Sequence, residues 1–256
     1  LMCKLKIFAF VLVALVGSSS VANAEPILLA ADDFVGISFW IISMGMLAAT
    51  AFFFLERNSV ATSWRTSVTV AGVITGVAFI HYMYMRDVWV QTGYSPIVFR
   101  YIDWLITLPL QMIEFYLILL TVRKVSGGIF WRLLIGSLVM IIGGYLGEAG
   151  YIKPILGFII WMAGWVYVLY EIYSGEAGKA AAKSGNKPFV TAFGALRMIV
   201  TVGWFIYPLG YIFGSLTGGL DPNSLNVIYN ITDFVNKIAF GIIIWAAAIS
   251  SGIKAK

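Results

Sequence analysis

The chain has 256 residues, of which 61% are hydrophobic and only 11% are charged. That composition excludes an ordinary soluble domain and predicts a polytopic membrane protein. The formal net charge of +5 does not require a nucleic-acid partner, because basic residues also collect in the cytoplasmic loops of membrane proteins.

Residues 1–24 have the pattern of a cleaved secretory signal peptide. Lys4 and Lys6 precede about ten apolar residues, and Ala22 and Ala24 supply the small side chains of a cleavage site. An eighth membrane helix is the alternative, although the apolar run is short for a span. Cleavage would remove Cys3, the only cysteine, and leave residues 25–256 as a mature domain without thiol chemistry.

Seven further apolar segments are each long enough to cross a bilayer and are bounded by polar residues, glycine or proline. Their expected spans are 34–55, 64–85, 96–122, 130–149, 154–173, 188–213 and 225–250. The longest connection, residues 174–186, is expected to be a loop of small residues. The sequence therefore predicts an all-α membrane protein, a bundle of seven transmembrane helices.

The basic residues predict the orientation of this bundle. One set of alternating connections holds only Arg86 and Lys153. The other set holds Arg57, Arg65, Arg123, Lys124, Arg132, Lys179, Lys183, Lys187, Lys254 and Lys256. Because cytoplasmic loops carry the excess of lysine and arginine, the second set is expected in the cytoplasm. The processed amino terminus is then outside, as a signal peptide requires.

The third segment carries a polar stripe on one helical face. Arg100, Asp103, Thr107 and Glu114 follow one another at spacings of three, four and seven residues. The helical rise puts Glu114 about 16 Å deeper than Asp103. Such a stripe favours a proton relay, and a buried polar seam between helices is the alternative. His81 in the second segment is the only histidine and lies near the outer end of that segment. It is either a functional residue or an ordinary residue at the membrane interface.

The seventh segment places Asp233 and Lys237 four residues apart, on one face of an apolar helix. A charged lysine near mid-membrane costs about 3 kcal/mol, so it is a functional candidate by default. A structural ion pair that fixes helix packing is the alternative. Aromatic residues at helical spacing in the fifth and sixth segments are more often packing, but beside a lysine they can wall a long, flat, apolar ligand.

These residues resemble the microbial rhodopsins, and within them the proteorhodopsins. The motifs that carry the resemblance are Arg100-Tyr-Ile-Asp103-Trp104 with Thr107 and Glu114, Trp204-x-x-Tyr207-Pro208, and Asp233-x-x-x-Lys237. The resemblance implies all-trans-retinal, buried in the centre of the bundle and bound to Lys237 as a Schiff base. It makes Asp103 the proton acceptor, Asp233 the second counterion and Glu114 the proton donor.

The same resemblance assigns several supporting residues. Arg100 is implied to lie beside the counterions, and His81 to pair with the acceptor carboxylate. Gln111 stands where blue-absorbing members have glutamine and green-absorbing members have leucine. The retinal-pocket positions are Trp104, Trp161, Trp204, Tyr207, Pro208 and Tyr211. The outer ends of segments six and seven offer only Asp221, in place of the paired glutamates that archaeal pumps use for fast proton release.

We therefore expect a light-driven outward proton pump in a bacterial inner membrane, an ion transporter and not an enzyme, with a blue absorption band and no metal site. Its expected partners are retinal, lipid, protons and further copies of itself in a ring of five or six. Sodium and chloride pumping are disfavoured, because their residue patterns differ from Asp103, Thr107 and Glu114. A slow photosensory rhodopsin and a seven-helix transporter or receptor without retinal are the alternatives.

Overall fold

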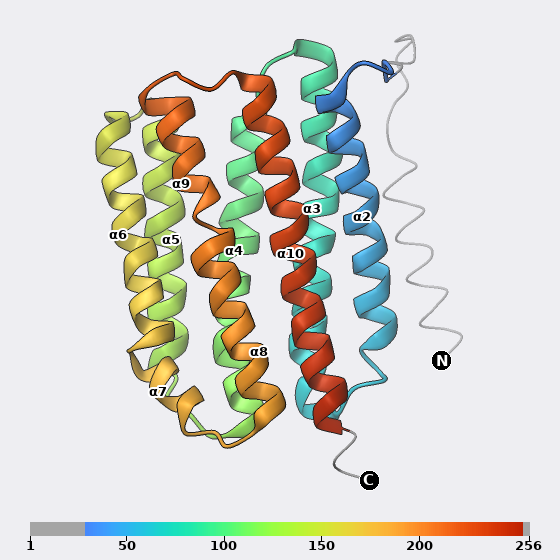
Figure 1. Ribbon diagram of the computed structural model, residues 1–256, viewed down its shortest axis with the longest axis vertical. Helices are drawn as coiled ribbons and strands as arrows, with labels where there is room; N and C mark the ends of the chain where they lie inside the picture. The colour runs from blue at the N-terminus through green and yellow to red at the C-terminus, as the bar shows by residue number, and fades with distance from the viewer. Residues whose placement is uncertain (1–28, 253–256) are drawn as a thin grey trace.

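The computed structural model describes residues 29–252. The described part of the chain is a bundle of antiparallel helices with seven membrane-spanning units and no strand (Figure 1). The expected signal peptide, residues 1–24, lies outside the described residues. Because a backbone in lipid must satisfy its hydrogen bonds within itself, seven apolar segments become seven helices.

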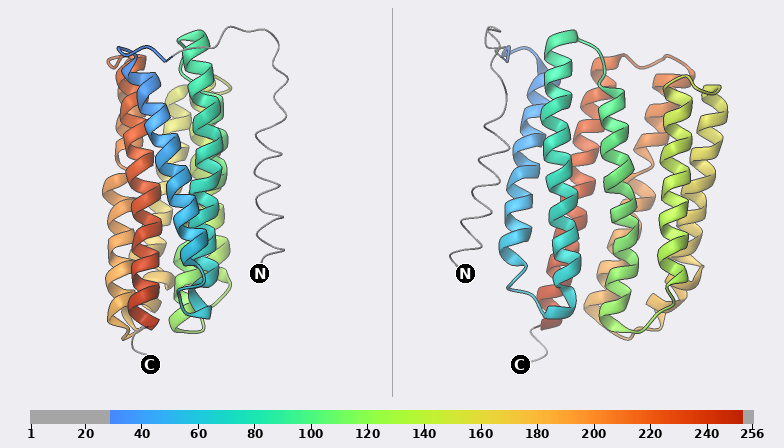
Figure 2. Two further views of the ribbon diagram at one scale, coloured as in Figure 1. Left: turned by 90° about the vertical axis from the view of Figure 1, so that its right-hand side faces the viewer. Right: turned by 180° about the vertical axis from the view of Figure 1, so that it is seen from behind.

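The helices run along the chain as follows: α2 (Phe34–Glu56), η1 (Thr62–Trp64), α3 (Arg65–Thr92), α4 (Ile97–Val122), α5 (Gly128–Glu148), α6 (Pro154–Tyr173), α7 (Glu176–Ala182), α8 (Lys187–Met198), η2 (Ile199–Gly203), α9 (Ile206–Tyr211), η3 (Ile212–Leu216) and α10 (Pro222–Gly252). The helix α10 contacts α2, α3, α8 and α9. Figure 2 shows α2 and α3 at one side of the bundle and α5 and α6 at the other.

The sixth span is not one regular helix. It consists of α8, the π-helical turn η2, α9 and a second π-helical turn, η3. Pro208 has no N–H to donate, so a regular ladder is interrupted here. The backbone N–H of Trp204 instead donates across five residues to the Ile199 carbonyl at 3.0 Å, which is the π-helical spacing. The prediction of a single span is confirmed, and the break lies at its centre.

The connection expected to be a loop, residues 174–186, contains the short helix α7, so that prediction was wrong in part. Glu176 lies in the first turn of α7, where its carboxylate interacts favourably with the positive end of the helix dipole. The helix is tied to the bundle by Arg132 of α5, which bridges Glu176 at 2.6 Å and Glu171 at 2.9 Å. Tertiary contacts of this kind are not visible in the composition of a loop.

Glycine lets α5 and α6 approach backbone to backbone. A Cβ built on Gly157 would lie 2.6 Å from the Gly147 Cα, and one built on Gly164 would lie 2.7 Å from the Met140 nitrogen. Small residues of this kind allow close helix packing in membranes, where association depends on van der Waals contact. The seam between α5 and α6 is therefore closed by the backbones themselves.

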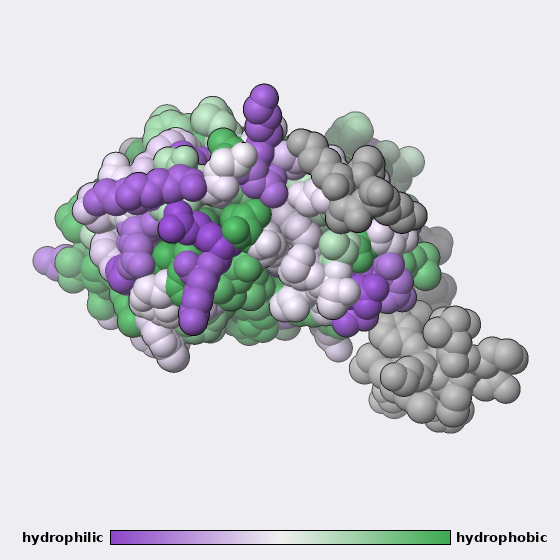
Figure 3. Space-filling view, turned by 90° about the horizontal axis from the view of Figure 1, so that it is seen from below, coloured by the Kyte–Doolittle hydropathy of each residue, from purple (hydrophilic) through white to green (hydrophobic). Residues whose placement is uncertain are grey.

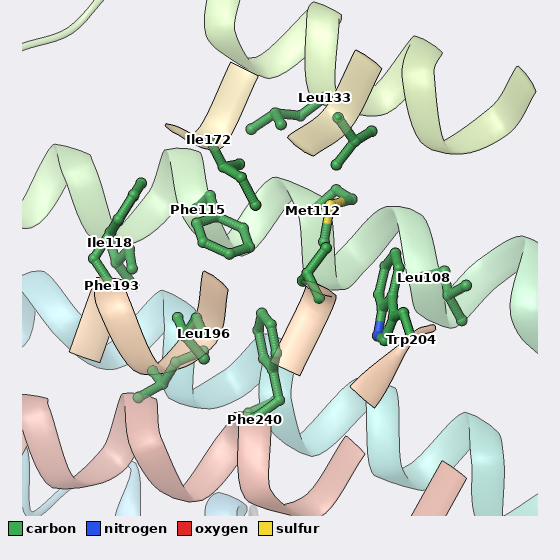
Figure 4. Packing of buried hydrophobic residues seen from close by; sticks show 14 of the residues in the cluster. Leu108, Met112, Phe115, Ile118, Leu133, Ile172, Phe193, Leu196, Trp204 and Phe240 are labelled. Atoms are coloured by element: carbon green, nitrogen blue, oxygen red, sulfur yellow. The ribbon is translucent and has the colours of Figure 1, made fainter. Parts of the chain in front are cut away.

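Apolar side chains fill the interior and also cover the surface that faces lipid. Figure 4 shows Phe115, Phe193 and Phe240 packed together from α4, α8 and α10. The centroid of the Phe115 ring lies 5.0 Å from that of Phe193 and 6.0 Å from that of Phe240. Hydrophilic side chains gather instead at the end of the bundle that carries the α4–α5 and α6–α8 connections (Figure 3). This distribution suits a protein whose long sides lie in lipid and whose ends lie in water.

Candidate functional site

The centre of the bundle holds a buried lysine between two carboxylates. Lys237 on α10 donates from Nζ to Asp233 Oδ2 at 2.8 Å and to Asp103 Oδ2 on α4. These three residues are at most 2% exposed. The spacing of four residues puts Lys237 directly over Asp233 on one helical face, while packing of α4 against the bundle brings in Asp103. The lysine is thus in direct contact with two buried carboxyl groups.

The two carboxylates are not equivalent. Asp233 accepts hydrogen bonds from the Tyr82 hydroxyl at 2.8 Å, the Tyr207 hydroxyl at 2.6 Å and the Trp104 indole N–H at 3.1 Å, in addition to Lys237. Hydrogen bonds to the charged form stabilise an ionised carboxylate. Asp103 Oδ1, by contrast, has no hydrogen-bond partner among the described residues. Asp103 therefore has an oxygen available for a proton, and Asp233 does not.

Arg100 is held by neutral groups. Its guanidinium donates to Asn226 Oδ1 at 3.0 Å, to Asn230 Oδ1 at 2.9 Å and to the Tyr82 hydroxyl at 3.4 Å. None of its partners in the described chain is a carboxylate, and the residue is 1% exposed. Tyr82 links Arg100 to the charge cluster, since the same hydroxyl donates to Asp233.

Sequence reasoning missed both asparagines, although a signal was present. Asn226, Asn230, Asp233 and Lys237 follow at spacings of four, three and four residues, so they form one face of α10. Asn230 also donates from Nδ2 to the Ser38 hydroxyl of α2 at 2.9 Å. This face continues the charge cluster toward the start of α10 as a line of polar side chains.

Glu114 lies on the same face of α4 as Asp103, as predicted, but in a different environment. Its side chain is 0% exposed, and neither carboxylate oxygen has a hydrogen-bond partner among the described residues. The Ser67 hydroxyl of α3 is the neighbouring polar group, and with no cation beside it a buried ionised carboxylate is costly, whereas the neutral acid is tolerated. Glu114 is therefore a buried group suited to carrying a proton.

His81 and Thr107 bond mainly to their own helices. The His81 Nδ1 lies 2.9 Å from the Val77 carbonyl, and the Thr107 hydroxyl donates to the Asp103 carbonyl at 2.9 Å. Among the described residues there is no direct hydrogen bond between His81 and Asp103, although the two are close enough to interact electrostatically. The expected pairing therefore lacks a direct hydrogen bond here.

A small apolar cavity lies beside the charge cluster. Its lining consists of Trp104, Leu108, Met140, Ile141, Trp161, Trp165, Trp204, Tyr207 and Pro208. Two of these residues, Trp104 and Tyr207, also donate hydrogen bonds to Asp233. The cavity and the charged cluster therefore share walls, and this combination fits retinal, a flat apolar ligand that ends at a lysine amine.

Two other predicted site residues, Tyr211 and Gln111, are not part of the lining of this cavity. The Tyr211 ring packs on Trp161 at 5.6 Å, and its hydroxyl donates to the Pro154 carbonyl at 2.9 Å, so it supports the wall. Gln111 donates from Nε2 to the backbone carbonyl of Asn236 at 3.4 Å, one residue before Lys237. The structure thus brings Gln111 to the backbone that carries the lysine.

The end of the bundle formed by α5, η3 and the start of α10 carries two further acids. Hydrogen bonds from Ser224 hold the pKa of Asp221 below its ordinary value, so this exposed residue is ionised at neutral pH. Glu148 on α5 accepts a hydrogen bond from the Ser215 hydroxyl at 2.5 Å and is only partly exposed. Sequence reasoning missed Glu148, because it lies on a different helix from Ser215. Among the described residues no cluster of three or more His, Cys, Asp or Glu side chains is arranged for a metal ion.

Comparisons with known proteins place these features in context. A family model described as bacteriorhodopsin-like protein matches residues 33–251. The blue-light absorbing proteorhodopsin of Gamma-proteobacterium Hot 75m4 is 54% identical over 226 residues, which are 88% of this chain and 90% of that protein. The green-light absorbing proteorhodopsin of Gamma-proteobacterium EBAC31A08 is 50% identical with the same coverage.

Two solved structures are similar over nearly their whole length. The crystal structure of blue light-absorbing proteorhodopsin from Med12 has 51% sequence identity and a TM-score of 0.75, and it matches 85% of this chain and 99% of its own. The crystal structure of Exiguobacterium sibiricum rhodopsin has 32% identity and a TM-score of 0.77, with coverage of 86% and 98%.

Proposed function

This chain belongs to the bacteriorhodopsin-like family, and from that premise we propose that it is a light-driven pump that moves protons outward through a cell membrane. It is a multi-pass membrane protein with seven spans and an ion pump, not an enzyme. The observation that carries the proposal is the buried Lys237 between Asp103 and Asp233, beside an aromatic cavity. Burying a lysine within a membrane is costly, so a lysine in this position indicates a functional site.

The retinal of this family is proposed to bind Lys237 Nζ in its all-trans form. When bound there it supplies absorption of light and an isomerisation that turns the N–H of the linkage. Trp104 and Tyr207 form the end of the cavity nearest the charges, and both are anchored by their hydrogen bonds to Asp233. Together with Trp161, Trp204 and Pro208 they would wall the ligand with apolar surface and exclude water.

Asp103 is proposed to receive the proton from Lys237 Nζ. The two groups are in direct hydrogen-bond contact, and Asp103 Oδ1 has no competing donor among the described residues. Asp233 remains ionised throughout, because Tyr82, Tyr207 and Trp104 already satisfy it. Arg100, next to this pair through Tyr82, favours the ionised carboxylates before transfer.

Glu114 is proposed to return a proton to Lys237 Nζ from the other half of the membrane. It is fully buried and has no hydrogen-bond partner among the described residues, so it suits a role as a stored acid. His81 is proposed to influence the charge on Asp103 electrostatically. Thr107 is proposed to hold the Asp103 backbone in place through its hydrogen bond to the Asp103 carbonyl. Transport from Glu114 toward Asp103 then corresponds to transport from cytoplasm to outside, given the basic residues of the cytoplasmic loops.

A blue absorption band is proposed from Gln111 and from the similarity to proteins named as blue-light absorbing. Gln111 brings an amide dipole to the backbone next to Lys237. We further propose an inner-membrane location in bacteria, an outside amino terminus, a cytoplasmic carboxyl terminus and a ring of five or six copies.

The test is the light-induced pH change of a suspension of retinal-supplied cells that express the full chain. Illumination is expected to acidify the medium, and a protonophore should abolish the change. D103N should abolish it too, whereas D87N should not, since Asp87 is half-exposed and pairs with Arg86 outside the cluster.

Three other outcomes would overturn parts of the proposal. A colourless protein would refute retinal binding and favour a transporter or receptor without retinal. A coloured protein that gives no pH change would favour the photosensory alternative. Pumping by D103N at the level of the unsubstituted protein would remove Asp103 from the acceptor role.

A further inference from the structure

The aromatic cavity is closed by its side chains, yet a second hollow lies directly behind one of its walls. This groove lies between α4 and α5 on the lipid-facing side of the bundle. Its lining includes Val98, Ile102 and Leu105 from α4 and Ile142 and Tyr145 from α5. Leu105 is 40% exposed and Ile142 is 47% exposed, so the mouth of the groove opens toward lipid.

Ile141 is the link between the two spaces. It lines both the groove and the cavity, and it is 2% exposed. On either side of it, α4 contributes Tyr101 to the groove and Trp104 to the cavity, and these rings meet edge to face at 5.2 Å. The groove and the cavity are therefore adjacent, and Ile141 is the lining residue that they share.

The neighbouring seam is built differently. Between α5 and α6 the backbones themselves are in contact, at Gly147 with Gly157 and at Gly164 with Met140. A second groove on that seam, lined in part by Ile135, Val139 and Tyr167, shares no lining residue with the cavity. Side chains can change rotamer without moving a helix, whereas backbone contacts open only when helices separate.

From this contrast, and resting on the proposed function, we propose that the groove between α4 and α5 is the lateral entrance through which retinal passes from the bilayer to Lys237, with Ile141 as its gate. The occupant follows from continuity with the cavity and from its chemistry. Retinal is apolar and dissolves in the bilayer, so an approach through lipid avoids transfer through water. An opening in the membrane-facing wall is the short path for such a molecule.

The test measures how fast the full-length protein, expressed without retinal and placed in phospholipid nanodiscs, forms its chromophore. The probe is all-trans-retinal supplied in phosphatidylcholine vesicles, and the readout is the rise of visible absorbance with time. I142W fills the mouth of the groove without touching the cavity, and it should slow the rise several-fold. Its final absorbance and peak position should match the unsubstituted protein.

The matched control is V139W, on the same helix one turn away. Val139 is 43% exposed, close to the 47% of Ile142, but it belongs to the groove that shares no lining residue with the cavity. V139W should leave the rate unchanged. L105W obstructs the opposite lip and should slow uptake as I142W does, which covers the case in which one variant folds poorly. I141A removes the gate and should accelerate uptake several-fold.

Equal rates for I142W, L105W and the unsubstituted protein would overturn the proposal, and so would a slowing by V139W alone, which would favour entry between α5 and α6. Failure of the unsubstituted protein to form any chromophore is a different result. It would refute retinal binding itself, and not only the route.

Discussion

Replacing Glu114 by glutamine tests the role of the isolated carboxyl on α4. The side chain is fully buried, and both of its oxygens lack hydrogen-bond partners among the described residues. E114Q keeps the shape but adds one buried N–H donor relative to the protonated acid, which costs about 1–3 kcal/mol if it stays unsatisfied. The variant should therefore fold and bind retinal, with somewhat lower stability.

The expected kinetic effect is larger. A positioned general acid contributes about 10²–10⁴-fold to a proton transfer, so recovery of the dark absorbance after a laser flash should slow by at least about 100-fold at pH 7. Without Glu114 the proton must come from water. The recovery rate of E114Q should then rise about tenfold for each unit that pH falls, as for any step first order in protons, whereas the unsubstituted protein should vary little near neutral pH.

Flash photolysis of the purified proteins between pH 6 and pH 9 measures both effects. E56Q makes the same substitution at a half-buried glutamate away from the α4 stripe, where Glu56 accepts a hydrogen bond from the Trp245 indole at 3.1 Å, and it serves as the control. E56Q should recover at the rate of the unsubstituted protein. Recovery of E114Q at that same rate, with no added dependence on pH, would refute the reasoning about Glu114.

Three further predictions concern packing, an exposed acid and colour. G157V should destabilise the protein by about 1–3 kcal/mol, since a Cβ there meets the Gly147 backbone at 2.6 Å. Thermal loss of visible absorbance measures this change in stability. G93A is the comparison, because its Cβ has open space and any loss of stability reflects only the positive φ at residue 93. D221N should leave pumping at neutral pH unchanged, because the lowered pKa of Asp221 leaves this residue no proton to release there. In the unsubstituted protein, the hydrogen bonds that the Asp221 carboxylate accepts from the start of α10 should weaken only when the pH falls through that lowered pKa. Hydrogen exchange of the Ser224 amide measures this weakening. Q111L should move the absorption maximum to longer wavelength, toward the green-absorbing relatives, and an unchanged spectrum would remove Gln111 from spectral tuning.

The amino-acid sequence by itself determined the seven spans and the contents of single helical faces. Lipid offers no hydrogen bonds to a backbone, so a sufficiently long apolar segment has little choice but to form a helix. Within one helix the period of 3.6 residues fixes which side chains share a face, which is why the stripe from Arg100 to Glu114 and the pair of Asp233 and Lys237 were predictable. The motifs within these faces were enough to identify the family.

Only the tertiary structure decided what each face meets. The full set of donors on Asp233, the free oxygen of Asp103 and the asparagine partners of Arg100 all depend on the rotation and depth of one helix relative to another. The spacing of residues along one helix does not contain that information. The same holds for Ile141, whose position between the cavity and the groove exists only because α4 and α5 meet through side chains while α5 and α6 meet through their backbones.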